Sequence, residues 1–258
     1  MKKAIITILF IFSVFDTFAQ DDYIDSLYFE SEEPVNVYKP YYSIGLGYLG
    51  NFFFLNFEDI NSHFLNNKFY LDELKAPLYL HGALLMIGIP NLDNTRISFY
   101  RCGGFKTILG KDTEISGNKY TNQGEYFVAY NGLSFDYALQ IAKSFVIVPS
   151  LSVGYGEIII EHSFTPNKYD WNNFLPGTNQ NAYINRIEAG FWMIQPSVNF
   201  EYTITGYSMI RASAGYNYSF MNQWKFNRGA ELENVPTSIN SSGFYLQFGI
   251  FLGIFNNI

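Results

Sequence analysis

The sequence has few of the residues that cross-link an exported chain or hold a metal. Cys102 is the single cysteine among 258 residues, so no disulfide framework is possible. The three histidines are His63, His81 and His162, and they follow no Cys/His spacing typical of a metal site. We therefore expect no disulfide, no bound metal and no cofactor.

Charge is also scarce, and basic residues are not concentrated anywhere. Charged residues make up 15% of the chain, whereas about 25% is usual for a soluble domain. The formal net charge is −7. Nucleic acid is therefore not an expected partner. No Walker or Rossmann glycine pattern is present either, which argues against nucleotide binding.

Long hydrophobic runs are missing, although hydrophobic residues make up 48% of the sequence. Beyond the N-terminal region, no stretch approaches the roughly 18 uninterrupted apolar residues of a membrane helix. The chain has 26 Phe and 21 Tyr instead. Such aromatic content is typical of strands and of the interfacial girdles of a membrane barrel.

Residues 1–19 have the features of a secretory signal peptide. Lys2 and Lys3 form the charged start, and the apolar stretch Ala4–Val14 is too short to span a bilayer as a helix. Thr17-Phe18-Ala19 supplies small residues before a cleavage point. An uncleaved membrane anchor is the alternative interpretation.

The segment 20–40 differs from the rest of the chain, because it carries six acidic residues and one basic residue, Lys39. We expect an extended, mobile periplasmic leader, since such a composition cannot form a core. A docking peptide for a periplasmic partner is the alternative. Residues 41–258 form the remaining domain.

The segment Ser242–Phe255 alternates between an apolar face and a smaller, more polar one. Its odd positions include Gln247, Gly249 and Gly253. Its even positions are Phe244, Leu246, Phe248, Ile250, Leu252 and Ile254. Successive side chains of a strand point to opposite faces. Behind a signal peptide, the apolar face is best covered by lipid.

Eight such strand-like runs, joined by connections of alternating length, follow residue 41. The runs are 41–57, 77–89, 95–109, 125–141, 145–162, 184–204, 208–221 and 242–255. The long connections are 58–76, 110–124, 163–183 and 222–241, and the short ones are Pro90–Asn94, Ala142–Ser144 and Thr205–Tyr207. Outer-membrane barrels have long external loops and short periplasmic turns. We therefore predict an all-β, transmembrane up-and-down antiparallel barrel of about eight strands in the cell outer membrane.

Two of these runs are irregular in pattern. The run 77–89 is apolar on both faces, so a core strand or a helix is also compatible with it. In 95–109, Arg101 and Lys106 fall on opposite faces, so one of them is misassigned or lies near an end of the strand. We predict a bulge at Gly103-Gly104 that would bring the two residues into one pattern.

Two prolines, Pro149 and Pro196, interrupt otherwise regular runs. Each removes one ladder donor from a strand of a barrel that has no free edge. We predict a local bulge at both positions.

Glu201 and Arg211 form the best-defined polar pair. They flank the turn Thr205–Tyr207, and a three-residue loop would place Glu201 opposite Arg211 and Ile204 opposite Ser208. Gly206 could supply the positive φ that such a loop needs. The other polar residues predicted to point into the lumen are Asp136, Gln195, Asn199, Asn217 and Gln247. We expect these side chains to fill the barrel, and a proton or ion path is the alternative.

The neighbouring His162 and Ser163 raise the possibility of a lipid esterase. Lipid A deacylases of the outer membrane use Ser, His and an acid, and the acids near this pair are Glu157, Glu161 and Glu188. Adjacent side chains of a strand point to opposite faces, however. Phe164 also occupies the position of the asparagine usual in that family. We therefore expect no catalytic residue.

Aromatic residues in two of the long connections are candidates for binding. They are Tyr169, Trp171, Phe174, Trp224 and Phe226. Loops are where barrels vary their function. The alternative is an interfacial aromatic girdle with solvated loop tips.

The chain resembles the small outer-membrane β-barrel proteins of Bacteroidota. The resemblance rests on Thr17-Phe18-Ala19-Gln20, Val148-Pro149-Ser150, Gln195-Pro196-Ser197 and the final aromatic strand. Such barrels often end on an aromatic residue, whereas three residues follow Phe255 here. The resemblance implies architecture and not activity.

We expect a non-enzymatic structural or interaction role, accessory or binding, through the extracellular loops. The expected partners are outer-membrane lipid, the barrel-assembly machinery during biogenesis, and a membrane or periplasmic protein. A lipid-modifying hydrolase and a narrow conduit for small molecules are the alternative functions.

Overall fold

The computed structural model describes residues 41–65, 71–115, 117–169 and 182–255, and every structural statement below concerns these residues. The predicted signal peptide (1–19) and acidic leader (20–40) lie outside them. Within the described ranges, no helix is long and apolar enough to cross a membrane.

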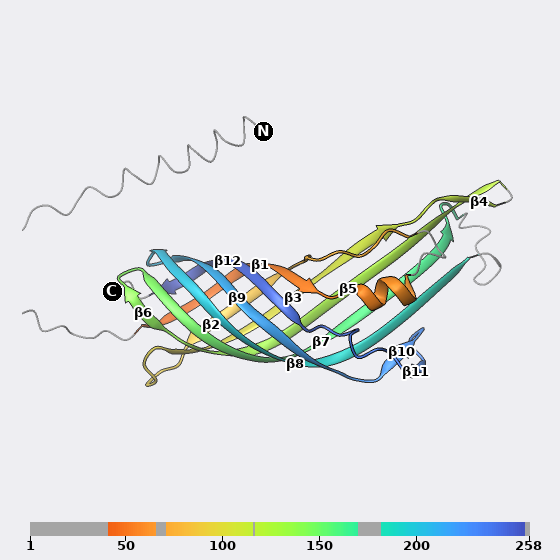
Figure 1. Ribbon diagram of the computed structural model, residues 1–258. Coiled ribbons are helices and arrows are strands. Elements are labelled where there is room, and N and C mark those ends of the chain that lie inside the picture. The colour runs from red at the N-terminus through yellow and green to blue at the C-terminus, as the bar shows by residue number, and fades with distance from the viewer. Residues whose placement is uncertain (1–40, 66–70, 116, 170–181, 256–258) are drawn as a thin grey trace, which may run out of the picture. The chain divides into compact units, whose positions relative to one another are not determined.

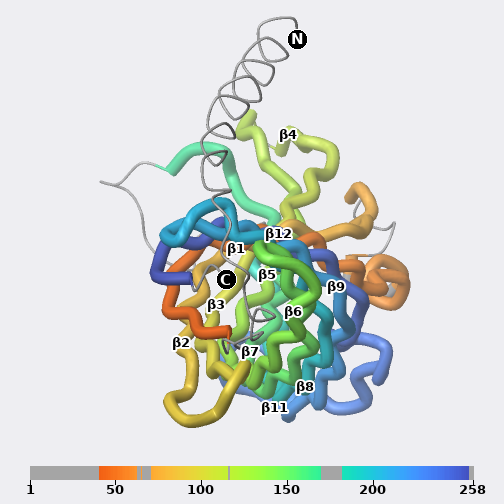
Figure 2. The backbone as a smooth tube through the Cα atoms, turned by 90° about the vertical axis from the view of Figure 1, so that its left-hand side faces the viewer, coloured from red at the N-terminus to blue at the C-terminus, as the bar shows by residue number. Residues whose placement is uncertain are grey.

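Eight antiparallel strands form a closed barrel (Figure 1). They are β1 (Ser43–Leu55), β2 (Leu78–Gly88), β3 (Thr95–Leu109), β5 (Asn118–Tyr137), β7 (Phe145–Pro166), β8 (Tyr183–Thr205), β9 (Ser208–Met221) and β12 (Gly243–Phe255). Each strand pairs with the next, and β12 pairs with β1, so that the strands form a ring in Figure 2. The predicted eight-stranded, all-β barrel is confirmed.

Short elements extend this ring. They are the π-helix η2 (Ile60–Phe64) and the strands β4 (Thr113–Ile115), β6 (Leu139–Ala142), β10 (Trp224–Phe226) and β11 (Ala230–Leu232). The strand β6 pairs with β7, and β4 pairs with β5. The strand β10 pairs with both β8 and β11.

The strands are staggered as a small closed barrel requires. A row of paired residues that starts at Tyr202 of β8 returns to β8 ten residues away, at Trp192. The row passes through Ile210, Ile250, Tyr48, Ala83, Arg101, Asn131 and Tyr155. Such a stagger tilts the strands by about 40° and leaves an interior that side chains can fill.

The outer surface of the barrel is apolar. On β12, Ile250 is 64% exposed and Leu252 is 68% exposed, whereas Tyr245 and Phe251 on the opposite face are buried. Aliphatic and aromatic side chains alternate outward in the same way on the other strands. Burying such a surface in lipid is favourable. The chain is therefore a transmembrane β-barrel of the outer-membrane type.

The ambiguous run 77–89 is a strand. In β2, Leu78, Leu80 and Met86 point into the barrel, while Tyr79 and Leu85 are exposed on the outside. Both faces are apolar because the outer face meets lipid and the inner face meets a hydrophobic core.

The bulge predicted at Gly103-Gly104 is not present. The pairing of β3 with β5 runs without a break from Thr95 to Leu109. The glycine at 104 is needed for another reason, because a Cβ there would collide with the backbone carbonyl of Tyr79. Arg101 points outward, and Lys106 points inward near the outer end, where its Nζ donates to the carbonyl of Lys75.

The bulges predicted at the two prolines are also absent. The register between β7 and β8 continues unchanged through Pro149 and Pro196. Beside Pro196, the β8–β9 ladder lapses between Ile194 and Ser197 and then resumes in the same register. Beside Pro149, the ladder lapses and resumes likewise where β5 gives way to β6. The missing donor is thus accommodated by a gap in pairing and not by an extra residue.

Three neighbouring strands are much longer than a membrane crossing requires. The strands β5, β7 and β8 have 20, 22 and 23 residues, whereas β1 and β2 have 13 and 11. A tilted strand needs about 9–11 residues to cross the bilayer. The surplus projects beyond the outer end of the barrel as one continuous sheet, together with β4, and we call this sheet the wall (Figure 1).

Candidate functional site

Four buried charges lie together in the periplasmic half of the interior, and we call them the charge tetrad. Arg96 Nε lies 2.9 Å from Asp136 Oδ2, and Arg96 Nη1 lies 2.8 Å from Glu201 Oε2. Arg211 Nη2 lies 2.8 Å from Glu201 Oε1. The four residues come from β3, β5, β8 and β9. Two cations and two anions cancel, which burial in an apolar interior requires.

Neighbouring groups add further contacts to the tetrad, although Arg211 Nε has no hydrogen-bond partner among the described residues. Ser98 Oγ donates to Asp136 Oδ2 at 2.9 Å, and the Tyr41 hydroxyl donates to Glu201 Oε2 at 3.3 Å. The guanidinium of Arg211 lies 4.7 Å from the ring centroid of Phe251, which adds a cation–π contact. The tetrad therefore ties several strands together across the lumen.

The structure pairs Glu201 with Arg211, as the sequence suggests, but the adjoining turn differs. Thr205 pairs with Ser208, and Ile204 is left as a bulge. The hydroxyl oxygens of Thr205 and Ser208 lie 2.8 Å apart across this tighter turn. Gly206 does not adopt a positive φ, because the bulge replaces the three-residue loop.

Arg96 is the tetrad residue that the sequence reasoning missed. It bonds both acids, whereas the sequence-based prediction for this strand concerns only Arg101 and Lys106. The signal was available, because Ile97 and Phe99 are apolar and alternate with Ser98 and Tyr100. That alternation places position 96 on the inner face.

The other polar residues predicted for the lumen are also placed inside the barrel. Gln195, Asn199 and Asn217 are buried, and Gln247 is partly buried. Gln195 accepts from the Tyr100 hydroxyl at 2.8 Å, and Asn199 Nδ2 donates to the Val148 carbonyl at 3.0 Å. Most of these residues surround a cavity of about 20 Å³, which is room for about one water molecule.

The outer half of the interior is a hydrophobic core. Its buried side chains from the strands include Leu49, Phe53, Leu80, Tyr126, Val128, Ile158, Ile160 and Phe191. Phe57, Ile60 and Leu65 from the first outer connection and Ile239 from the last one join the same core. An aqueous path along the described part of the barrel would therefore have to cross a packed apolar layer.

Two of the loop candidates belong to this core and not to a free surface. Trp224 is 6% exposed, and Phe226 packs against the core. The strand β10 extends the sheet of the barrel by pairing with β8, so that Trp224 points inward. Tyr169 is 51% exposed, whereas Trp171 and Phe174 lie outside the described residues.

His162 and Ser163 do not form a nucleophile–base pair. His162 points inward and is 2% exposed, and its Nε2 lies 2.9 Å from Asn122 Oδ1. Ser163 lies on the opposite, outer face of β7. A hydroxyl nucleophile must lie within hydrogen-bond reach of its base, so this geometry offers none.

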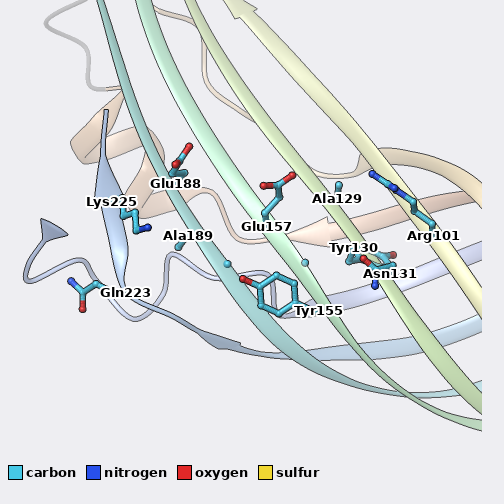
Figure 3. Close-up of a pocket in the computed structure, with 12 residues that line it drawn as sticks. Arg101, Ala129, Tyr130, Asn131, Tyr155, Glu157, Glu188, Ala189, Gln223 and Lys225 are labelled. Carbon is cyan, nitrogen blue, oxygen red and sulfur yellow. The ribbon is translucent and has the colours of Figure 1, made fainter. Parts of the chain in front are cut away.

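A polar groove lies on the outer face of the sheet, where β3, β5, β7, β8 and β10 are adjacent (Figure 3). Its volume is about 340 Å³. Its charged lining residues are Arg101, Glu157, Glu188 and Lys225. The groove therefore places both signs of charge beside a surface that is otherwise apolar.

Closed strands, an apolar exterior and a packed interior define a small transmembrane β-barrel of the outer-membrane class. No family model matches the sequence, and no curated protein matches it.

The solved structures that match this chain include three outer-membrane proteins, with TM-scores below 0.5. A major outer membrane protein from Thermus thermophilus is 9% identical with a TM-score of 0.46, over 83% of this chain and 99% of that one. Ail, the attachment invasion locus protein of Yersinia pestis, is 12% identical with a TM-score of 0.33, over 84% and 100%. The outer membrane protease OmpT from Escherichia coli is 7% identical with a TM-score of 0.19, over 84% and 94%. At these identities and TM-scores, the matches carry no argument about the function of this chain.

Proposed function

We propose that this barrel is a non-enzymatic interaction protein of the outer membrane, whose wall binds a protein partner outside the bilayer. The observation that carries the proposal is the surplus of paired strand in β5, β7 and β8, which have 20 to 23 residues each. A membrane crossing uses about half of that length. A paired sheet holds its side chains in fixed positions, which is what a binding surface needs.

The outward face of the wall offers mixed contacts for such a partner. Glu125, Glu161 and Arg186 lie side by side on β5, β7 and β8. Two like charges directly opposite each other are unfavourable in an isolated sheet, and a basic partner would relieve them. Ile184 adds an apolar side chain that is 54% exposed.

The interior supports this proposal over a conduit or a hydrolase. A neutral, mutually bonded charge tetrad and a hydrophobic core are what a structural filling needs, since a channel requires a continuous polar lumen. The separation of His162 from Ser163 on opposite faces argues against a lipid esterase built on that pair.

We further propose that the chain is of the Bacteroidota type, on the residues of the resemblance described above. Its partners in that setting are outer-membrane lipid, the barrel-assembly machinery and a protein of the membrane or the periplasm. The acidic segment 20–40 is the part of the chain suited to a periplasmic partner.

Site-specific photo-crosslinking in cells tests the proposed wall surface. A photoreactive residue replaces Ser163 on the outward face of the wall or, as the control, Lys143 in a short periplasmic turn. The proposal predicts a discrete crosslinked protein from position 163 that is absent from position 143. It also predicts that Ile184→Asp abolishes this product without lowering the amount of folded barrel. Crosslinks only to lipid, or the same products from both positions, would contradict the proposal.

A further inference from the structure

The polar groove on the outer face contains a cation where lipid is expected. Arg101 points outward from β3, between Phe99 and Phe105 on the same face, which are 48% and 64% exposed. Its side chain forms no salt bridge or hydrogen bond with any residue of the described ranges. An arginine that faces lipid is costly unless an anion or water reaches it. A ligand of negative charge would therefore stabilise Arg101 at this position.

The groove is hollow because small residues line it. Ala129 and Gly190 stand beside Glu157 on the neighbouring strands. The Tyr155 hydroxyl lies over Gly190, where a Cβ would collide with it. The Tyr155 ring packs edge-on against Trp192 at 5.4 Å between centroids. Tyr155 therefore contributes an aromatic side chain to the lining of the groove.

The distribution of charge along the groove indicates the kind of ligand. Figure 3 shows Arg101 and Lys225 at opposite ends, with Glu157 between them. Neither Lys225 nor Glu157 has a side-chain partner within the described ranges, whereas Glu188 is held by Arg186 at 2.7 Å. Cations at the ends suit phosphate groups. The carboxylate of Glu157 and the amide of Asn131 suit hydroxyl groups.

We propose that this groove binds a phosphorylated glycolipid of the outer leaflet, with its phosphates at Arg101 and Lys225 and its sugar hydroxyls at Glu157 and Asn131. Its acyl chains would lie on the apolar belt below, where Phe99 and Leu133 are exposed. A soluble anion would make no contact with that apolar belt. The proposed ligand is therefore the phosphorylated lipid and not a free phosphate. This site is independent of the protein partner proposed for the wall.

Native mass spectrometry of the full barrel in detergent tests the site, with a bis-phosphorylated acylated disaccharide as the probe. The expected result is retention of one lipid by the wild type and about tenfold weaker retention by Arg101→Ala, as loss of one charge-assisted contact implies. Lys225→Ala should weaken retention similarly. Lys143→Ala, in a periplasmic turn, is the matched control and should bind as the wild type does.

Two further measurements distinguish the ligand from its alternatives. The wild type should retain the dephosphorylated disaccharide lipid no better than Arg101→Ala retains the bis-phosphorylated one. Free sugar phosphate should not displace the bound lipid from the wild type. In vesicles without anionic lipid, Arg101→Leu should unfold at the same temperature as the wild type or at a higher one. This result would show that the barrel folds without the arginine at position 101. Equal retention by wild type and Arg101→Ala, equal binding of the dephosphorylated lipid, or competition by free sugar phosphate would overturn the proposal.

Discussion

At the scale of single residues, Arg96 is the cation that forms ion pairs with both acids of the charge tetrad. It bonds Asp136 and both oxygens of Glu201, and it is 2% exposed. Arg211 alone could not neutralise two carboxylates. Removing one partner from a buried ion cluster leaves an uncompensated charge in an apolar setting.

Arg96→Met should therefore lower the free energy of unfolding by about 3–5 kcal/mol. Arg101→Met is the matched control, because this arginine faces outward and has no described partner, and in vesicles without anionic lipid it should not lower the free energy of unfolding. Urea unfolding in lipid vesicles, followed by electrophoretic mobility, measures both. A barrel of unchanged stability after Arg96→Met would mean that water or another group neutralises the acids.

At the scale of elements, alternation of side chains was enough to predict the eight strands and the face of most residues. The predictions of a bulge at Gly103-Gly104, at Pro149 and at Pro196 were wrong for a common reason. A pattern within one strand does not reveal how its neighbour accommodates a missing donor or a close backbone approach. The pairing of β10 with β8 is a contact across sequence, and it determines that Trp224 is buried.

The burial of Trp224 and the exposure of Tyr169 predict losses of stability of different size when each residue is replaced by alanine. Trp224→Ala should destabilise the barrel by about 3–5 kcal/mol, as expected for loss of a buried aromatic side chain. Tyr169→Ala should lower stability much less than Trp224→Ala does, because the side chain of Tyr169 is 51% exposed. The temperature of the electrophoretic shift between folded and unfolded bands compares them. Similar losses from both variants would contradict the burial of Trp224.

At the scale of the whole molecule, the barrel is a filled cylinder with its distinctive features on the outside. The polar half of its interior is neutral and mutually bonded, and the other half is a hydrophobic core. The wall and the groove are both on outer surfaces, where a partner or a lipid can reach them. We therefore assign the proposed functions to the exterior of the barrel and its stability to the interior.

Single-channel recording of the purified full barrel in planar bilayers tests this division most directly. The packed core and the small polar cavity predict no unitary current steps above those of a protein-free bilayer, at either polarity of voltage. Reproducible unitary steps from the wild-type protein would contradict a filled interior and favour the conduit.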